Sequence, residues 1–162
     1  LRSTGITGIF CQHHEFWQPN GHAHLHKGKN RYFTTDYLVV SVMRHFSWLR
    51  QLVIAYDIVC QWSKNLRGRL CCVPSRFTIA PRAVTFVVEV LPKTVFVVPK
   101  FHLAAHKQSC QAHFNLTFTP GVGLTDGEAS EQAWAGVNPV AASMKEMGPG
   151  SARDTMEDRC GF

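Results

Sequence analysis

The stretch QLVIAYDI, residues 51–58, combines β-branched, aliphatic and aromatic side chains and carries a single acid, Asp57. A short apolar run of this composition predicts a buried strand. Asp57 then lies at the carboxyl end of that strand, the edge of an open α/β sheet at which ligands and metals bind. Because an ionised carboxylate is unstable in apolar surroundings, we interpret Asp57 either as a metal ligand or as a cap for the helix that follows.

The segments on either side of this strand alternate between helical and extended patterns. Upstream, a Thr/Asp cap precedes apolar residues at helical spacing, which predicts a helix from about 36 to 48. Downstream, strong helix formers at 59–70 are followed by two strand-like runs, at 83–91 and 94–101. Strands that alternate with helices predict an α/β fold with at least part of a parallel sheet.

Helical composition returns in the C-terminal half of the chain. A helix is predicted over 102–114, and a second begins after the break TPGVG, at 125–137. Pro139 is expected to end this second helix or to fall just past its end. The tail beyond the Gly/Pro turn is expected to form one more short helix. Near the start, the histidine-rich segment 13–30 contains the turn sequence PNG and is expected to be a loop.

The net charge of +6 is unevenly distributed. Residues 61–110 carry eight Lys and Arg against one acid, Glu89, whereas seven of the eleven acids follow residue 120. A basic middle segment could form a surface that binds a polyanion, and an acidic C-terminal part could form a cation-binding cluster. A basic protein without either function explains the charge equally well. The six cysteines form no CxxC pair, which indicates reduced thiols in an intracellular protein.

No membrane segment is expected. The apolar runs at 84–91 and 95–99 are interrupted by Glu89, Pro92 and Lys93. None therefore approaches the roughly 18 to 20 residues that cross a bilayer. The chain opens on Leu1 without a methionine or a leader pattern, which indicates a fragment of a longer protein.

The stretch GLTDGEASEQAW, residues 123–134, places three acids next to a predicted helix start. Thr125 and Glu128 have the spacing of a capping box, in which the hydroxyl and the carboxylate satisfy free backbone amides. That interpretation accounts for Glu128 and leaves Glu131 without a structural role. Because Glu128 and Glu131 are three residues apart, they share a helix face, and one or both could point toward a site.

A third motif, HLAAHKQSC, places His102, His106 and Cys110 at intervals of four residues, on one stripe of the predicted helix. Imidazole and thiolate groups at this spacing are suited to zinc. A strong zinc site needs about four ligands, however. A buried, hydrogen-bonded structural stripe is therefore the favoured interpretation, and zinc is the alternative.

Five blocks of the sequence, in order, resemble the KDZ (Kyakuja-Dileera-Zisupton) transposases of fungi. The resemblance covers roughly residues 11–160. The blocks are KGKNRYFTTDYL, YDIVCQWSKNLRGRL, VPKFHLAAHKQSCQ, PGVGLTDGEASEQAW and NPVAASMKEMGPGSARDT.

This resemblance implies a DDE-type DNA transposase with a ribonuclease H-like α/β fold, which cleaves and transfers DNA strands with two divalent ions, Mg²⁺ or Mn²⁺. It implies that Asp57 is the second catalytic aspartate and that Glu128 or Glu131 is the glutamate. It gives His102, His106 and Cys110 a site-supporting or structural role, with zinc as the lesser possibility. It also implies nuclear localisation, DNA as the partner and a possible homo-oligomer. The basic residues expected to face the DNA backbone are Lys64, Arg67, Arg69, Lys100 and Lys107.

Three features depart from the family pattern. The first catalytic aspartate belongs on an earlier strand, upstream of Leu1, and Asp36 belongs to a different, helix-starting block. Gln132 stands where we expect an arginine, and the histidine-rich loop replaces a more neutral one. We therefore expect one partial catalytic domain, incomplete at its N-terminus and inactive by itself, with a loop-rich part at 1–34 and a core at 35–162.

Two alternatives to a transposase fragment remain open from the sequence. One is a decayed or domesticated copy that binds nucleic acid or protein without catalysis. The other is a small zinc-binding domain built on His102, His106 and Cys110.

Overall fold

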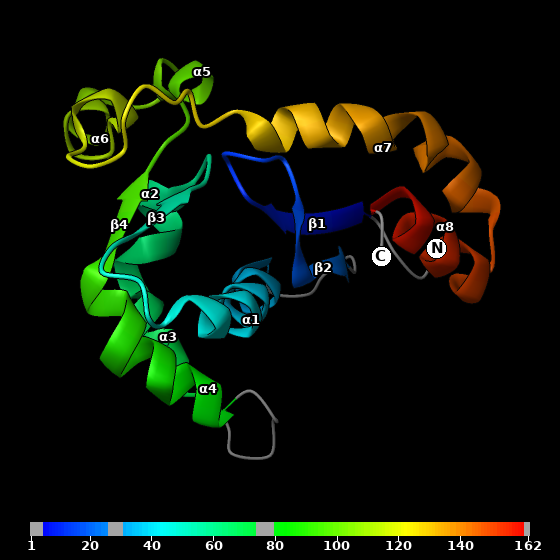
Figure 1. Cartoon of the computed structure of the whole chain (residues 1–162), viewed down its shortest axis with the longest axis horizontal. Helices are drawn as coiled ribbons and strands as arrows, with labels where there is room; N and C mark the ends of the chain where they lie inside the picture. The colour runs from blue at the N-terminus through cyan, green and yellow to red at the C-terminus, as the bar shows by residue number, and fades with distance from the viewer. Residues whose placement is uncertain (1–4, 26–30, 74–79, 161–162) are drawn as a thin grey trace.

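The computed structural model describes residues 5–25, 31–73 and 80–160 of the chain (Figure 1). Its strands and helices make a mixed α/β arrangement with two small sheets. In chain order the main elements are β1 (Gly5–Phe10), β2 (Trp17–Leu25), α1 (Arg31–Met43), β3 (Leu52–Ala55), α2 (Val59–Trp62), α3 (Leu66–Cys71), α4 (Ala80–Thr85), β4 (Thr94–Val97), α5 (Lys100–Leu103), α6 (Gln108–His113), α7 (Ala129–Glu146) and α8 (Pro149–Cys160).

Each sheet has two strands in the described part of the chain. β1 and β2 pair antiparallel, whereas β3 and β4 pair parallel, with Leu52 opposite Thr94 and Ala55 opposite Val97. The parallel pair confirms the expected strand at 51–58 and the expected parallel sheet. Because parallel strands present their carboxyl ends at one edge, the residues that follow β3 and β4 are brought close together.

The main hydrophobic core lies among α1, α2, α3 and α4. Val42, Val59 and Trp62 are fully buried in it, and Ile54 and Phe96 from the parallel sheet pack against it. On the other side of α1 lies the β1–β2 hairpin. Figure 1 shows α7 leaving the α5–α6 region, passing the hairpin and ending near α8. Among the helices that the structure describes, none has the length and apolar character needed to cross a membrane.

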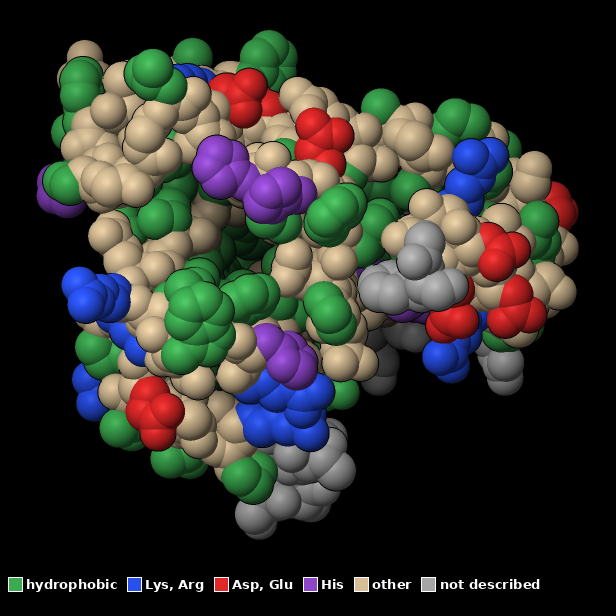
Figure 2. All heavy atoms as spheres, in the orientation of Figure 1, with side chains coloured by type: hydrophobic (Ala, Val, Ile, Leu, Met, Phe, Trp, Pro, Cys, Tyr) green, Lys and Arg blue, Asp and Glu red, His purple; other side chains and the backbone are tan. Residues whose placement is uncertain are grey.

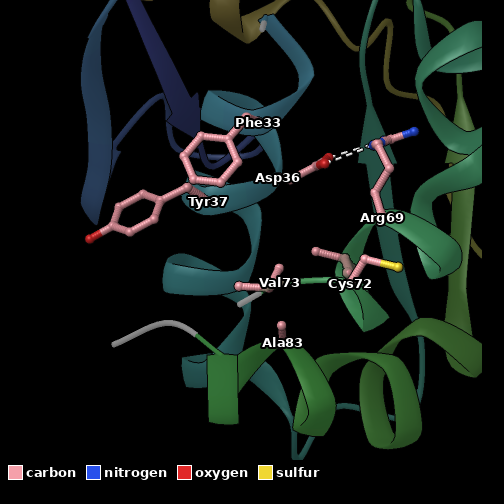
Figure 3. A pocket seen from close by; sticks show the side chains of 8 residues that line it. Phe33, Asp36, Tyr37, Arg69, Cys72, Val73 and Ala83 are labelled. Carbon is pink, nitrogen blue, oxygen red and sulfur yellow. Dashed lines mark hydrogen bonds and ion pairs between the residues drawn. The ribbon is translucent and has the colours of Figure 1, made fainter. Parts of the chain in front are cut away.

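Asp36 sits inside α1, so the predicted cap at Thr/Asp is wrong: the helix starts earlier, at Arg31, and continues as a 3₁₀ turn from Arg44 to Phe46. The buried Asp36 carboxylate accepts hydrogen bonds from Trp62 Nε1 at 2.7 Å and from Arg69 Nε at 2.8 Å. Figure 3 shows this ion pair at the wall of a pocket of about 250 Å³ beside Tyr37. Because the Asp36 carboxylate accepts hydrogen bonds from Trp62 in α2 and Arg69 in α3, it links α1 to both helices.

The strand predicted over 83–91 is also wrong. That segment continues α4 through a π-helical turn, Phe86–Val90, and a 3₁₀ turn, Leu91–Lys93. Its buried residues recur at helical intervals, Ala83, Phe86, Val87 and Val90, whereas Val84 and Val88 are 60% and 65% exposed. The β-branched composition suggested a strand, but burial follows the helical period.

Three further predictions differ from the structure. Part of the histidine-rich segment forms β2 in place of a loop. The single helix expected over 102–114 is two short helices, because the chain turns between α5 and α6 and Lys107 is extended. Helix α7 runs through Pro139 to Glu146. The helix expected in the C-terminal tail is confirmed as α8.

Candidate metal centre

Asp57 lies just beyond the carboxyl end of β3, and two other polar side chains meet it there. His102 comes from α5, the first helix after β4, and Glu131 comes from the first turn of α7. His102 Nε2 lies 3.7 Å from Asp57 Oδ1 and 3.5 Å from Glu131 Oε1. One ligand atom from each residue lies within 4.8 Å of the other two. We call Asp57, His102 and Glu131 the acidic cluster.

The spacing within the acidic cluster leaves room for one ion between the three side chains. Both distances from His102 Nε2 exceed the roughly 2.7–3.2 Å of a well-formed hydrogen bond. This nitrogen is buried and has no hydrogen-bond partner among the described residues. Since a buried polar atom without a partner is costly, a cation between the imidazole and the two carboxylates would satisfy it.

Glu128 is the residue just before α7, and Glu131 lies in its first turn. The two side chains have different environments. Glu128 Oε1 accepts a hydrogen bond of 2.8 Å from the backbone N–H of Phe101, at the start of α5. Glu128 therefore ties α5 to the start of α7, while Glu131 points to Asp57 and His102. The residue-by-residue geometry separates the two glutamates, which the sequence left open.

The predicted capping box of Thr125 and Glu128 does not form. Thr125 Oγ1 accepts from the N–H of Gly127, and Asp126 Oδ1 accepts from the N–H of Glu128 at 3.0 Å. Glu128 is the N-cap residue of α7 and makes no side-chain bond to that helix. Asp126 is outside the acidic cluster.

A second cluster of possible ligands contains Cys60, His106 and Cys110, which we call the thiol cluster. Cys60 Sγ lies 3.5 Å from His106 Nδ1. Burial is the main cause that raises the pKa of the Cys60 thiol, and the neighbouring Cys110 adds to it. The predicted stripe of His102, His106 and Cys110 is therefore divided, because the turn between α5 and α6 sends His102 to the acidic cluster.

The sequence reasoning did not identify Cys60 as a possible ligand. It lies in α2, 46 positions before His106, so no local spacing pattern connects the two residues. The one feature of the sequence that could have indicated Cys60 is its position three residues after Asp57, in the helical turn that follows β3.

Four of the five basic residues expected to contact DNA are exposed: Lys64, Arg67, Lys100 and Lys107. Arg69 differs, because its guanidinium bonds to Asp36 and to the carbonyl oxygen of Trp62 at 2.8 Å. Figure 2 shows acidic side chains over the α7–α8 region of this face, with Lys and Arg among them, and further Lys and Arg side chains along its other side.

The fold and this site define a mixed α/β protein with carboxylate and imidazole groups gathered where parallel strands end, an arrangement suited to holding divalent metal. The family model of the Kyakuja-Dileera-Zisupton (KDZ) transposases matches residues 1–162. The chain therefore belongs to the KDZ transposase family. No curated protein and no solved structure matches it.

Proposed function

We propose that this chain supplies part of the catalytic centre of a DNA transposase, and that Asp57 and Glu131 are its metal-binding carboxylates. The observation that carries the proposal is their convergence on the buried, unpartnered Nε2 of His102. The two carboxylates of this set fit divalent ions such as Mg²⁺ or Mn²⁺, which prefer carboxylate oxygen. Asp57 and Glu131 would hold such ions, whose chemistry when bound would be to activate the attacking hydroxyl or water and to stabilise the leaving oxygen of a phosphodiester.

The side chains around the acidic cluster have distinct parts in this proposal. Asp57 and Glu131 supply negative charge from two separate elements, and His102 fixes the distance between them. Glu128 holds the start of α5 through the Phe101 amide, so that His102 keeps its orientation. Lys100 is exposed and lies two residues before His102, and in this proposal its ammonium group contacts a DNA phosphate.

The order of the elements supports a ribonuclease H-like core. An antiparallel hairpin and α1 precede the parallel strands β3 and β4, and the proposed acids follow those strands. In the described residues the two sheets are separate. A further strand between β1 and β3 would join them and would bring the family's first aspartate to the acidic cluster.

Figure 2 shows a hollow with hydrophobic side chains inside it on this face, between the halves of the molecule that hold the two sheets.

The acidic cluster of the described residues holds two carboxylates, whereas the proposed mechanism calls for three. We therefore expect residues 1–162 by themselves to cleave DNA little. We also propose that the protein acts in the nucleus, where its DNA substrate lies.

Metal-dependent nicking of supercoiled plasmid by a full-length protein that includes this chain tests the proposal. Asp57→Asn and Glu131→Gln should abolish nicking, because each removes a carboxylate from the acidic cluster. Glu128→Gln should keep it, since the amide oxygen still accepts the Phe101 N–H. Nicking at the wild-type rate by Asp57→Asn would refute the proposal. DNA binding without any metal-dependent nicking would favour a decayed or domesticated binding module.

A further inference from the structure

The thiol cluster lies outside the acidic cluster and has no part in the proposed DNA chemistry. Its three residues come from separate segments: Cys60 from α2, His106 from the turn after α5, and Cys110 from α6. Two thiols and one imidazole are thus brought within 4.8 Å of one another across a large distance in sequence. Cys60 is buried and the other two are partly buried, so packing against the rest of the protein restricts the positions of all three side chains.

The donor atoms of the thiol cluster select a different metal from the acidic cluster. Thiolate sulfur and imidazole nitrogen bind zinc, whereas Mg²⁺ and Mn²⁺ favour carboxylate oxygen. In a tetrahedral zinc site with the usual bond lengths, sulfur and nitrogen ligands lie about 3.5 Å apart. The Sγ of Cys60 and the Nδ1 of His106 are separated by 3.5 Å.

The local backbone is arranged to present His106 and Cys110 to Cys60. Helix α5 ends at Leu103, and Gln111 Nε2 holds the turn after it by donating to the carbonyl oxygen of His106 at 2.7 Å. In an uninterrupted helix His102, His106 and Cys110 would lie on one stripe. The turn instead separates His102 from the other two and leaves them facing α2.

We propose that Cys60, His106 and Cys110 bind one zinc ion, with a fourth position open to solvent or to a group from elsewhere in the protein. Binding converts the two thiols to thiolates and releases two protons, while the imidazole binds in its neutral form. The ion ties α2 to the α5–α6 segment. This inference does not depend on transposase activity.

The zinc ion would also position the acidic cluster. Asp57 precedes Cys60 by three residues, and His102 precedes His106 by four. A bond between the two segments at the thiol cluster therefore fixes the distance between Asp57 and His102. Cys60, His106 and Cys110 are positioning residues in this respect, since none of them belongs to the acidic cluster.

Elemental analysis of the purified chain, loaded with zinc and then passed over a chelating resin, tests the proposal. We expect about one zinc per chain in the wild type and in Cys71→Ser, which changes an exposed cysteine at the end of α3. Cys60→Ser and Cys110→Ser should retain less than a tenth of that amount. His106→Gln should also lose most of the zinc, because it removes the imidazole ligand. The matched control is His113→Gln, which changes an exposed histidine on the same helix as Cys110 and should keep the zinc.

A second measurement on the wild type covers the case in which the variants fail to fold. Cobalt in place of zinc should give an intense thiolate-to-metal charge-transfer band, and a strong chelator should increase the number of rapidly reacting thiols by two. Three results would overturn the proposal: wild-type chain without zinc or a cobalt band, zinc retained by Cys110→Ser but lost by Asp57→Asn, or a disulfide between Cys60 and Cys110 in protein purified under reducing conditions.

Discussion

Two glutamates one helical turn apart serve different purposes in this chain. Glu128 accepts a hydrogen bond from the Phe101 amide, and Glu131 faces the imidazole of His102 and the carboxylate of Asp57. The first arrangement stabilises the fold, whereas the second brings like charges together and gains little stability without a cation. The proposed metal binding and the stabilising hydrogen bond are therefore assigned to two different, neighbouring residues.

This difference predicts that the two alanine variants lose different amounts of stability. Glu128→Ala should lower the free energy of unfolding by about 1 kcal/mol, because the Phe101 amide loses its acceptor. Glu131→Ala should change it by less than about 0.5 kcal/mol, as expected for an exposed side chain without a hydrogen bond. Urea unfolding followed by circular dichroism measures both values. A larger loss from Glu131→Ala than from Glu128→Ala would contradict the assignment.

Asp36 is the other acid whose role is decided by its contacts. Asp36→Asn should destabilise the chain by about 2 to 3 kcal/mol, because Arg69 loses its partner in a buried ion pair. The expected value is at the lower end for such pairs, since the Arg69 side chain is 22% exposed. Urea unfolding again gives the measurement. Arg153→Gln, which breaks the exposed pair of Arg153 and Glu157 on α8, should leave the unfolding midpoint almost unchanged; an equal shift in both variants would refute a special role for Asp36.

At the scale of elements, the junction before α7 places Glu128 and Glu131 in their separate environments. Gly127 has a φ of +79°, and a Cβ at this position would lie 3.1 Å from Leu116 Cδ2 and 3.4 Å from Pro99 Cα. The chain turns sharply here, against the residues that lead into α5. A glycine is required because a side chain would meet both backbone strain and close packing.

Gly127→Ala and Gly136→Ala should therefore have effects of opposite sign. Gly127→Ala should destabilise the chain by about 1 to 3 kcal/mol, through a left-handed conformation and the contact with Leu116. Gly136 lies inside α7 with nothing within 4 Å of an added Cβ, so Gly136→Ala should stabilise the chain by about 0.5 to 1 kcal/mol. Thermal and urea unfolding of the two variants test this. A stabilising Gly127→Ala would show that the junction is not as tight as described.

The elements also show how far the sequence determines the structure. The apolar run ending at Asp57 was correctly predicted as a strand, because the partly buried Leu52 and Ile54 pack against the core and residues 52–55 pair with β4. The helix at 80–93 was missed, because Val and Phe favour strands in isolation while tertiary packing uses their helical spacing. The turn between α5 and α6 was not predicted, because residues 102–114 have helical composition throughout; a hydrogen bond from Gln111 Nε2 to the carbonyl oxygen of His106 stabilises this turn.

Tertiary packing also limits the prediction of the candidate sites. Asp57, Glu131 and His102 were each identified from local patterns or from the family resemblance, but their mutual distances depend on the packing of β3, α5 and α7. Cys60 was missed for this reason as well. Local sequence indicates which residues have side chains that can bind metal, and tertiary structure decides which of them lie close together.

At the scale of the whole molecule, charge is divided between two regions. The exposed basic residues Lys64, Arg67, Lys100 and Lys107 lie on the segments that carry Asp57 and His102, whereas α7 and α8 hold five of the eleven acids and three Lys and Arg. In the proposed function, a DNA backbone approaching the acidic cluster would thus meet these cations on one side of it. Such a distribution orients a polyanion without reading its sequence.

Salt dependence of DNA binding tests this orientation. Lys64→Gln or Lys100→Gln should weaken binding to unrelated sequences alike and lower the slope of log K against log salt by about 1, because one phosphate contact is lost. Lys145→Gln changes an exposed lysine near the end of α7 and should leave the slope unchanged. Fluorescence anisotropy over a salt series provides the slopes. Equal slopes for all three variants and the wild type would contradict the proposed DNA face.

The central claim is that Asp57, His102 and Glu131 form a divalent metal site. Titration of the zinc-loaded chain with Mn²⁺, followed by the loss of the free-ion electron paramagnetic resonance signal, tests it most directly. We predict saturable binding in the wild type and in Glu128→Gln, and at least about tenfold weaker binding in Asp57→Asn and Glu131→Gln, since loss of a ligand costs no less than loss of its supporting contacts. Unchanged Mn²⁺ affinity in Asp57→Asn would contradict the account.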